Sequence, residues 1–264
     1  MPRAKRRWGQ HFLTDPRLLA RIADALVPSS TDTVLEIGPG RGALTAALAE
    51  RAGRVVAIEK DRDLVPELRR RFPTVSVVQA DALVADWHQL AGQDFLVTGN
   101  IPYNITSPLL DKALLSPRPR RIVFLVQREV ADRVTAAAGT EAYGALSIGV
   151  QAVAQTERLF SVPAGAFRPR PRVDSAVLRL TPLDAPLVAP REEEGFRRMV
   201  VGLFSFRRKQ LLRGLRQLTG WEPDRLAAVL STVGVAPGLR PEALAPPAFV
   251  DLYRALVDGG YVAR

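Results

Sequence analysis

The stretch Thr33-Val-Leu-Glu-Ile-Gly-Pro-Gly-Arg-Gly-Ala43 joins a run of strand-forming residues to a glycine-rich turn. Its first half has the near-continuous apolar character that a strand needs when both faces of a parallel sheet are covered. Glycines allow a tight turn and a close approach of the backbone to a ligand, with the N-terminus of a helix directly behind. The stretch therefore predicts a nucleotide-type binding site where the first buried strand gives way to a helix.

Similar short runs recur along the first two thirds of the chain, with helical patterns between them. The further strand-like runs are residues 54–59, 75–79, 94–98 and 121–127, and the helical patterns include residues 43–51 and 64–72. This alternation is typical of α/β proteins with a doubly wound, mostly parallel sheet. Two later runs, residues 147–154 and 173–181, are expected to close the sheet as an antiparallel pair, which gives seven strands.

The character of the chain changes after Thr181. Residues 182–190 are interrupted by three prolines and are typical of a linker. Helical patterns follow at residues 192–204, 207–218, 223–233 and 246–257. We therefore expect two domains, residues 1–182 with the sheet and a smaller α-helical domain at residues 183–264.

Two acidic residues stand at the ends of the second and third strands. Glu59 comes 19 residues after Gly40, and an acid at such a position can accept hydrogen bonds from both hydroxyls of a ribose. Asp81 follows the next strand, where it can accept from the amino group of an adenine. A glycine turn with two acids at strand ends fits either NAD or S-adenosylmethionine, so these residues alone leave the cofactor open.

The end of the fourth strand favours S-adenosylmethionine. Asn100-Ile-Pro-Tyr103 stands at the carboxyl edge of the sheet, where ligands of such sheets bind, and it resembles the Asn/Asp-x-Pro-Tyr signature of amino-directed N-methyltransferases. An adenine N6 is a weak nucleophile because its lone pair is delocalised into the ring. The Asn100 amide oxygen and a backbone carbonyl of the Ile101-Pro102 turn can accept its two hydrogens, while the Tyr103 ring can stack on the base. Catalysis then consists mostly of positioning and electrostatics, without a metal or a strong base.

Further segments spread over nearly the whole chain carry a closer resemblance. They are Gly9-Gln-His-Phe-Leu13, Val34-Leu-Glu-Ile-Gly-Pro-Gly40, Gln79-Ala-Asp-Ala82, Gly99-Asn-Ile-Pro-Tyr-Asn104, Tyr143-Gly-Ala-Leu-Ser147, Ala166-Phe-Arg-Pro-Arg-Pro-Arg-Val-Asp-Ser175 and Phe204-Ser-Phe-Arg-Arg-Lys209. On these segments the chain resembles the bacterial small-subunit (16S) rRNA adenine N6,N6-dimethyltransferases. The resemblance implies a Rossmann-like methyltransferase fold. It also implies S-adenosyl-L-methionine as the methyl donor, with S-adenosyl-L-homocysteine as its product. It also implies dimethylation of two adjacent adenosines in the 3′-terminal hairpin loop of 16S rRNA, during small-subunit biogenesis.

The functional residues of that family carry over position by position. The resemblance implies cofactor contacts at His11, Leu13, Gly38, Gly40, Glu59, Asp81 and Asn100, and a catalytic motif at Asn100, Ile101, Pro102 and Tyr103. It further implies that Phe167 stacks on the target base opposite Tyr103, and a Phe in a segment rich in Pro and Arg is poorly placed for burial. The family usually has Asn where this chain has His11, so a side-chain contact there differs and a backbone contact does not.

The distribution of basic residues favours a polyanionic partner. Lys and Arg number 37 against 27 Asp and Glu, a net charge of +10. Residues 196–216 hold seven basic residues and no acid, and residues 1–21 hold six against a single acid. The planar fork of arginine suits phosphates. We expect 16S rRNA and the assembling 30S subunit as partners of a monomer. The expected RNA contacts are Arg168, Arg170, and, at the start of a helix, Arg207, Arg208 and Lys209.

Composition argues against several other classes of protein. The chain has no cysteine and two histidines, so we expect no disulfide, no thiolate chemistry and no metal site. No apolar run approaches the ~18 residues of a membrane span, and the basic N-terminus lacks the apolar stretch of a signal peptide. These features predict a cytoplasmic protein without a membrane partner.

Some alternatives remain open at this point. The nearest rivals among enzymes are 23S rRNA methyltransferases and DNA adenine N6-methyltransferases, but the Phe204–Lys209 segment and the basic helical tail favour the small-subunit enzyme. Relatives that serve as mitochondrial transcription factors bind nucleic acid with catalysis secondary, and the intact Asn100–Tyr103 motif argues against that role. In a nicotinamide-dependent dehydrogenase, the Asn100–Tyr103 motif would have no function.

Overall fold

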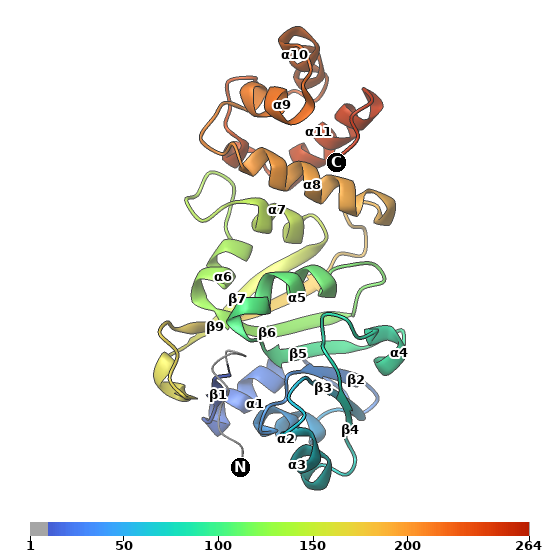
Figure 1. Cartoon of the computed structure of the whole chain (residues 1–264), viewed down its shortest axis with the longest axis vertical. Coiled ribbons are helices and arrows are strands. Elements are labelled where there is room, and N and C mark those ends of the chain that lie inside the picture. Colours follow the sequence, from blue (N-terminus) through green and yellow to red (C-terminus); the bar gives the residue numbers. More distant parts are fainter. Residues whose placement is uncertain (1–9, 264) are drawn as a thin grey trace. The chain divides into compact units, whose positions relative to one another are not determined.

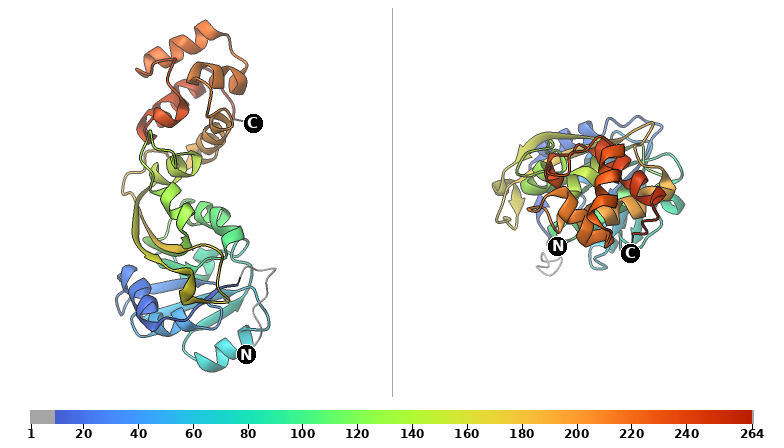
Figure 2. Two further views of the ribbon diagram at one scale, coloured as in Figure 1. Left: turned by 90° about the vertical axis from the view of Figure 1, so that its left-hand side faces the viewer. Right: turned by 90° about the horizontal axis from the view of Figure 1, so that it is seen from above.

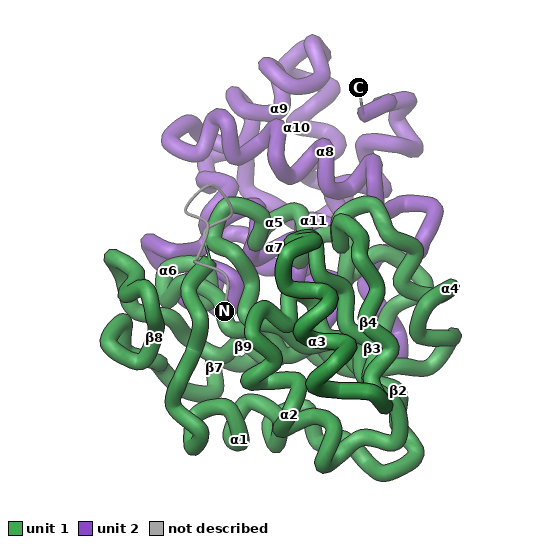
Figure 3. The backbone as a smooth tube through the Cα atoms, turned by 60° about the horizontal axis from the view of Figure 1, so that its bottom comes forward, with its two compact units in different colours: residues 1–131, 156–182 green, residues 132–155, 183–264 purple. Residues whose placement is uncertain are grey.

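The structure is a computed structural model that describes residues 10–263, so the basic residues 1–9 and the last residue lie outside the described part. The chain divides into two compact units (Figure 3). Unit 1 comprises the chain up to residue 131 together with residues 156–182, and unit 2 comprises residues 132–155 and 183–264. Within the described part, no helix has both the length and the apolar character to cross a membrane.

A seven-stranded sheet forms the centre of unit 1 (Figure 1). In the order in which they pair, its strands are β4 (Ser76–Gln79), β3 (Arg54–Glu59), β2 (Thr33–Ile37), β5 (Leu96–Asn100), β6 (Arg121–Gln127), β9 (Ser175–Pro182) and β7 (Ala154–Val162). Neighbours from β4 to β6 are parallel, and β9 runs antiparallel to β6. The predicted seven-stranded, mostly parallel sheet is confirmed.

The strand order determines where a ligand can bind. β2 lies between β3 and β5, so the chain runs outward from β2 through β3 to β4 and then returns to β5 on the other side of β2. Ile37 is in register with Ile58 on one side and with Gly99 on the other. The residues that follow these three positions therefore meet at one edge, the carboxyl ends of the strands, where such sheets bind ligands.

Helices of unit 1 alternate with the parallel strands. They are α1 (Pro16–Ala25), α2 (Ala43–Ala49), α3 (Val65–Arg71), α4 (Trp87–Ala91) and α5 (Thr106–Ala113), while α6 (Arg128–Val134) spans the boundary to unit 2. The start of α1 is determined by Asp15, whose carboxylate accepts from the N–H groups of Arg17 and Leu18. Such capping satisfies backbone donors that the helix itself leaves unpaired.

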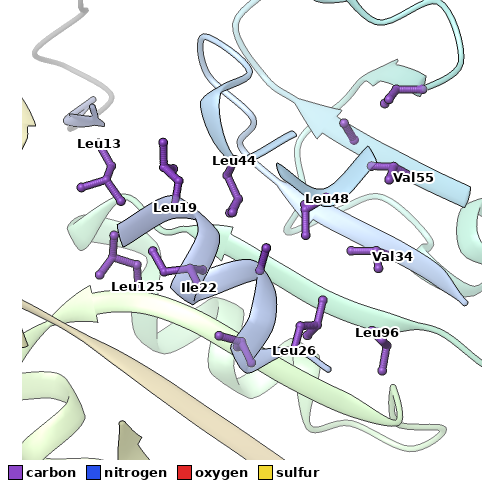
Figure 4. Packing of buried hydrophobic residues seen from close by; sticks show 14 of the residues in the cluster. Leu13, Leu19, Ile22, Leu26, Val34, Leu44, Leu48, Val55, Leu96 and Leu125 are labelled. Atoms are coloured by element: carbon purple, nitrogen blue, oxygen red, sulfur yellow. The ribbon is translucent and has the colours of Figure 1, made fainter. Parts of the chain in front are cut away.

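One apolar cluster joins the first two helices to the sheet (Figure 4). Its buried members include Leu19, Ile22 and Leu26 of α1, Leu44 and Leu48 of α2, and Val34, Val55 and Leu96 of the strands. Each such side chain contributes about 1.5–3 kcal/mol when it is fully buried. The cluster therefore fixes both elements that flank the glycine turn, which lies between β2 and α2.

A second, two-stranded sheet connects the N-terminal segment to a distant part of unit 1. β1 (Phe12–Leu13) pairs antiparallel with β8 (Phe167–Arg168), with Phe12 opposite Arg168 and Leu13 opposite Phe167. Short 3₁₀ segments stand nearby in the chain, η2 (Tyr103–Ile105) after β5 and η3 (Ala164–Ala166) before β8. This pairing brings the Gln10–Leu13 segment to the site described below.

Unit 2 consists mainly of helices, which Figures 1 and 2 show from three directions. They are α7 (Ala145–Gln151), α8 (Glu193–Phe204), α9 (Leu211–Thr219), α10 (Pro223–Thr232) and α11 (Pro246–Asp258), with 3₁₀ segments η4 (Pro190–Glu192) and η5 (Pro241–Ala243). The buried Tyr143 donates its hydroxyl to the carbonyl of Leu244 at 2.8 Å, and Phe204 packs against Tyr143 and Phe249. The predicted helical C-terminal region is confirmed.

The prediction of a strand at residues 147–154 is wrong, because α7 occupies most of this run and β7 begins only at Ala154. The start of α7 has a local cause, since the hydroxyl of Ser147 accepts from the N–H of Gly144 at 3.0 Å. A short apolar run does not distinguish a buried helix from a buried strand.

The position of α7 also bears on the domain boundaries. α7 packs against α8 and α11, so residues 132–155 group with the helical unit, whereas the sequence places them within a domain at residues 1–182. The boundary after residue 182 is the same in both divisions.

Candidate active site

A pocket of about 130 Å³ lies at the carboxyl ends of β2, β3, β4 and β5. Its lining includes most of the site residues predicted from the sequence: His11, Gly38, Gly40, Glu59, Asp81, Asn100, Ile101, Pro102 and Tyr103. Leu13 is not in the lining, because its side chain is buried in the apolar cluster of unit 1. The structure thus brings together motifs that are far apart in the sequence.

The glycine turn forms one wall of this pocket. Gly38, Gly40 and Gly42 have φ angles of 67°, 58° and 77°, a region that side-chain-bearing residues enter only at a cost. At Gly40 a Cβ atom would also come within 2.8 Å of the Phe12 ring. Glycine is therefore required at Gly40 for both its backbone conformation and its close approach to the N-terminal segment.

Glu59 holds the glycine turn from the neighbouring strand. Its side chain is 5% exposed, and its two oxygens accept from the N–H of Gly40 at 3.0 Å and from that of Asp61 at 2.7 Å. Burial raises the pKa of Glu59, and these backbone hydrogen bonds oppose the rise. Each carboxylate oxygen has a further lone pair, so Glu59 can also accept from the hydroxyls of a ribose.

Asp81 forms an ion pair with Lys60 in the lining of the same pocket. Lys60 Nζ lies 2.7 Å from Asp81 Oδ2, and Asp81 Oδ1 accepts from the N–H of Leu83 at 3.0 Å. The hydrogen bond from Lys60 lowers the pKa of Asp81, so the carboxylate stays ionised at neutral pH and can accept from an amino group. Lys60 could not be recognised as a site residue from the sequence, because a lysine after a strand carries no signal of its own.

Glu36 is a further buried acid, to which the sequence assigns no role. It is 1% exposed and accepts a hydrogen bond from the Thr45 hydroxyl at 2.6 Å. Burial raises the pKa of Glu36 to about 8, with a smaller contribution from nearby Glu59. The position of this carboxyl inside an apolar strand could have indicated a special role from the sequence alone, since such a group must be paired or neutral.

Among residues 10–263, no three His, Asp or Glu side chains are grouped so as to hold a metal ion.

The Asn100–Tyr103 motif follows β5 directly. Nδ2 of Asn100 donates to the backbone carbonyl of His11 at 2.7 Å, and within the described part of the chain its amide oxygen accepts no hydrogen bond. The carbonyl of Pro102 accepts from two groups in the following turn. The amide oxygen of Asn100 and the carbonyl of Ile101 are thus the acceptors that this motif can present to a ligand.

Tyr103 and His11 contribute aromatic rings to the pocket. The Tyr103 hydroxyl forms a hydrogen bond with Ser175 Oγ at 2.8 Å, and burial raises the pKa of Tyr103. The His11 ring stacks on Tyr103 with a centroid distance of 5.7 Å and an interplanar angle of 29°. His11 Nδ1 lies 2.8 Å from the carbonyl oxygen of Pro169. His11 therefore connects the N-terminal segment, the catalytic motif and the segment after β8.

The prediction that Phe167 escapes burial is wrong. Its side chain has no exposed surface and belongs to the apolar cluster of unit 1, because the pairing of β8 with β1 places it opposite Leu13. In this structure the ring presents no surface to a ligand, and its expected role in stacking on the target base opposite Tyr103 stays a prediction. In the described structure, the aromatic rings of the pocket lining are those of Phe12, Tyr103 and His11.

Arg168 and Arg170 lie just after Phe167 and are exposed. One terminal nitrogen of Arg168 donates to the carbonyls of Gly165 and Phe167, both at 2.9 Å. These bonds use a single nitrogen of the guanidinium, which carries five N–H donors in all. Arg168 can therefore still donate to phosphate.

The other predicted RNA contacts, Arg207, Arg208 and Lys209, belong to unit 2. The prediction that they open a helix is wrong, because they lie in the turn between α8 and α9. Arg207 Nε lies 2.6 Å from a carboxylate oxygen of Glu242, and Nη2 donates to the carbonyl of Glu141 at 2.8 Å. Arg208 and Lys209 are exposed. Folding thus supplies Arg207 with an acidic partner that its own stretch of sequence lacks.

Comparison with known families and proteins gives consistent matches. The model of a family described as "Ribosomal RNA adenine dimethylase" matches residues 1–256. The "Ribosomal RNA small subunit methyltransferase A" of Geobacter metallireducens is 43% identical, with 98% of this chain and 97% of the relative covered. The protein of the same name from Bordetella avium is 42% identical, with the same coverage. That of Maridesulfovibrio salexigens is 38% identical, with 96% of each chain covered.

Two solved structures are similar over nearly the whole chain. The crystal structure of the 23S rRNA methyltransferase ErmE is 31% identical with a TM-score of 0.73, and covers 93% of this chain and 99% of its own. The crystal structure of a dimethyladenosine transferase from Plasmodium falciparum is 26% identical with a TM-score of 0.84, and covers 95% of this chain and 98% of its own. Both likenesses extend over the sheet and the C-terminal helices.

Proposed function

Because the chain belongs to the ribosomal RNA adenine dimethylase family, we propose that it dimethylates N6 of two adjacent adenosines in the 3′-terminal hairpin loop of 16S rRNA. The chain is an rRNA adenine dimethyltransferase that depends on S-adenosylmethionine. Relatives named as small-subunit methyltransferases are 38–43% identical over nearly the full length, against 31% for the 23S rRNA methyltransferase. This difference supports the small-subunit substrate. We propose that the protein acts as a monomer on assembling 30S subunits in the cytoplasm.

The acceptor groups of the pocket fit S-adenosylmethionine. We propose that Glu59 accepts from the ribose hydroxyls and Asp81 from the adenine amino group, since both line the pocket. The Gly38–Gly40 turn would then allow the backbone to approach the rest of the molecule. When bound, the cofactor supplies a methyl group that is already activated on a sulfonium. The protein therefore has to position the acceptor amine and exclude water, rather than activate the donor.

Asn100 and Ile101 are the residues that we propose hold the target amine. The Asn100 amide oxygen and the Ile101 carbonyl accept its two hydrogens, which directs the nitrogen lone pair toward the methyl group. The Tyr103 ring stacks on the base. The observation that carries the proposal is the position of this motif, at the end of β5 in the same pocket as Glu59 and Asp81.

Basic side chains of both units are proposed to contact the RNA backbone. Arg168 and Arg170 follow β8, whose pairing with β1 also brings His11 to the pocket. Arg208 and Lys209 stand exposed on unit 2. We assign Arg207 a supporting role instead, since it is bonded to Glu242 and Glu141.

A competition between substrates tests this function. The protein is incubated with radiolabelled S-adenosylmethionine and a mixture of 30S subunits lacking these methyl groups, 50S subunits and double-stranded DNA. We expect label in 16S rRNA alone. Label in 23S rRNA or in DNA at a comparable rate would contradict the proposed substrate. Calorimetry with NAD in place of S-adenosylmethionine should show no binding to the pocket.

A further inference from the structure

A second cavity, of about 780 Å³, lies within unit 2. Its walls are residues of α8, the end of α9 with the turn that follows it, and the segment after α11. α8 packs against both α9 and α11, so the walls belong to elements that support one another. Pockets for small ligands commonly measure about 300–1,000 Å³. This cavity shares no residue with the pocket at the ends of β2 to β5, and the proposed function leaves it without a role.

The charge of the lining is positive. Arg197 and Arg198 of α8 line the cavity, and no described residue of the lining is acidic. Burial lowers the pKa of Arg197, but an arginine remains protonated in proteins. Arg198 forms an ion pair with Glu194, one turn away on the same helix. Since an exposed pair of this kind contributes little, an anion that enters the cavity can replace Glu194.

Aromatic side chains provide another part of the wall. Trp221 and Tyr261 line the cavity, and Tyr261 is 9% exposed. The indole N–H of Trp221 and the hydroxyl of Tyr261 have no hydrogen-bond partner among the described residues. The guanidinium of Arg225 covers one face of the indole, with Cζ 3.6 Å from the ring centroid. Because Arg225 does not line the cavity, the cavity meets the part of the indole that Arg225 leaves uncovered. A flat ring with hydrogen-bond acceptors at its edge fits such a wall.

Two glycines leave room in the cavity. Gly220 and Gly260 line it with φ angles of 73° and 91°, a region that residues with a side chain rarely adopt. A Cβ atom at either position would meet no other atom within 4 Å. Each glycine therefore borders open space, and its backbone conformation selects against a residue whose side chain would fill that space.

Exposed cations stand on α9, the helix that ends at the cavity. Arg213 and Arg216 lie one turn apart and are exposed, while Leu211 and Leu215 are buried on the other side of the helix. Neither arginine has a hydrogen-bond or ion-pair partner among the described residues. α9 ends at Thr219, which lines the cavity. These unpaired charges, together with the cavity at the end of the helix, suit a chain of phosphates better than a single one.

We propose that this cavity binds one unpaired nucleotide of the rRNA substrate. Its phosphate contacts Arg197 and Arg198, its base lies against Trp221 and Tyr261, and neighbouring phosphates of the same strand lie along α9. Proteins commonly recognise single-stranded RNA with basic side chains on the backbone and aromatic side chains on splayed bases. The proposal rests on the proposed function, because it assigns a second contact with the same RNA.

Binding to 30S subunits that lack the methyl groups tests the charge of the cavity. Arg198→Ala and Arg191→Ala each remove one exposed arginine of unit 2, but Arg191 does not line the cavity. We expect Arg198→Ala to weaken binding and to flatten its salt dependence by ~0.7 of a log unit, the value for one phosphate contact with a single strand. Arg191→Ala should keep the affinity and slope of the wild type. Glu194→Gln should tighten binding, because it leaves Arg198 without its ion-pair partner.

Two results of this comparison would overturn the proposal. Equal losses of affinity in Arg198→Ala and Arg191→Ala would indicate a general attraction between opposite charges rather than a site. No loss in Arg198→Ala would show that no phosphate lies at the cavity.

Ultraviolet cross-linking to 30S subunits, followed by mass spectrometry of the peptides, tests the position of the base. We expect a nucleotide of 16S rRNA on Trp221 or Tyr261 of the wild type, and much less of this adduct with Arg198→Ala. Trp221→Ala should weaken binding roughly fivefold to a hundredfold, the effect of removing one aromatic contact with a base. Should Trp221→Ala fail to fold, the exposed Arg198→Ala still decides. Cross-links confined to peptides outside the cavity would overturn the proposal.

A free nucleotide has the same phosphate and base as a nucleotide within RNA, so calorimetry with AMP and UMP distinguishes these two sources. We expect at most weak, millimolar binding, because a free nucleotide lacks the neighbouring phosphates that lie along α9. Micromolar binding that Arg198→Ala abolishes, with no effect of this variant on 30S binding, would overturn the proposal in favour of a small-molecule site.

The binding and cross-linking measurements do not depend on methyl transfer, so they separate this inference from the proposed function. If the wild type binds 30S subunits and cross-links at the cavity but transfers no methyl group, the proposed function fails and the inference about the cavity stands. If methyl transfer occurs and Arg198→Ala binds and methylates 30S subunits as the wild type does, only the inference about the cavity fails.

Discussion

Asn100 donates a hydrogen bond from Nδ2 to the carbonyl of His11, and we propose that its amide oxygen accepts from the target amine. Replacing Asn100 by Ala should lower the methylation of 30S subunits by about a hundredfold or more, the cost of removing one preorganised hydrogen-bonding group. Cofactor affinity, measured by calorimetry, should fall much less. Turnover close to that of the wild type would show that another group holds the amine.

Glu59 should matter for the cofactor rather than for the chemical step. We expect Glu59→Ala to weaken S-adenosylmethionine binding by ~1.5–3 kcal/mol, since it removes hydrogen bonds to a charged group, or roughly tenfold to a hundredfold in Kd. Glu59→Gln keeps an oxygen for the N–H of Gly40 or Asp61 and should have a smaller effect. Calorimetric affinities equal to the wild type in both variants would mean that a different acid binds the ribose.

Glu36 should make the stability of the protein depend on pH. Its pKa is about 8 in the folded protein, against an ordinary value of 4.5 for a glutamate, so between these pH values the unfolded chain releases a proton that the folded chain retains. Stability is highest below that window and falls as pH rises through it, by up to about 1.4 kcal/mol per pH unit.

Glu36→Gln removes this proton and keeps an acceptor for the Thr45 hydroxyl. Urea unfolding at a series of pH values should therefore show a smaller fall in the free energy of unfolding for Glu36→Gln than for the wild type. The same slope in both proteins would mean that Glu36 is ionised in the folded state.

Site residues could be predicted from the sequence where each stands at the end of its own strand. Glu59, Asp81 and Asn100 are of this kind, because a strand end is a local feature and parallel strands bring their ends to one edge. Phe167 could not be placed in this way, because its burial depends on pairing with Leu13 at the other end of unit 1. The residues next to Phe167 in the sequence do not indicate that it pairs with Leu13.

At the scale of elements, the basic residues of the turn between α8 and α9 have two different surroundings, although they form one continuous run in the sequence. Arg207 is bonded within unit 2, whereas Arg208 and Lys209 are exposed. Replacing Arg208 and Lys209 by Ala should weaken binding to 30S subunits and flatten its salt dependence, by ~0.7–0.9 of a log unit for each phosphate that is no longer neutralised. S-adenosylmethionine affinity should not change.

Arg207→Ala is the comparison variant for this turn. It should lower the stability of the protein, because it removes the partner of a partly buried Glu242. A salt dependence of 30S binding that is the same in the wild type and the Arg208/Lys209 double variant would show that these two residues are merely solvated.

Element types followed from the sequence where a run was rich in β-branched residues and nearly continuously apolar, and failed where the apolar residues of a run suited a helix equally well. The strands at 54–59 and 121–127 match β3 and β6. The run at 147–154 does not, because its apolar residues serve equally well as the buried side of a helix. What decides between the two is packing against α8 and α11, which no local pattern reveals.

At the scale of the whole molecule, the alternation of strands and helices predicts a mostly parallel sheet, whereas the order of its strands is seen only in the structure. The division into units could be expected only at residue 182, where prolines mark a linker. The inclusion of residues 132–155 in unit 2 depends on tertiary contacts of α7. The Asn100–Tyr103 motif and the exposed Arg208 and Lys209 therefore lie in different units.

The central claim is that the pocket at the ends of β2 to β5 dimethylates two adjacent adenosines of 16S rRNA. The most direct measurement maps modified nucleotides by mass spectrometry in 30S subunits that lack these methyl groups, after incubation with S-adenosylmethionine and either the wild type or Asn100→Ala. We predict N6,N6-dimethyladenosine at both adjacent positions of the 3′-terminal hairpin loop with the wild type, and almost none with the variant. Dimethylation elsewhere in the rRNA, or equal amounts with both proteins, would contradict the claim.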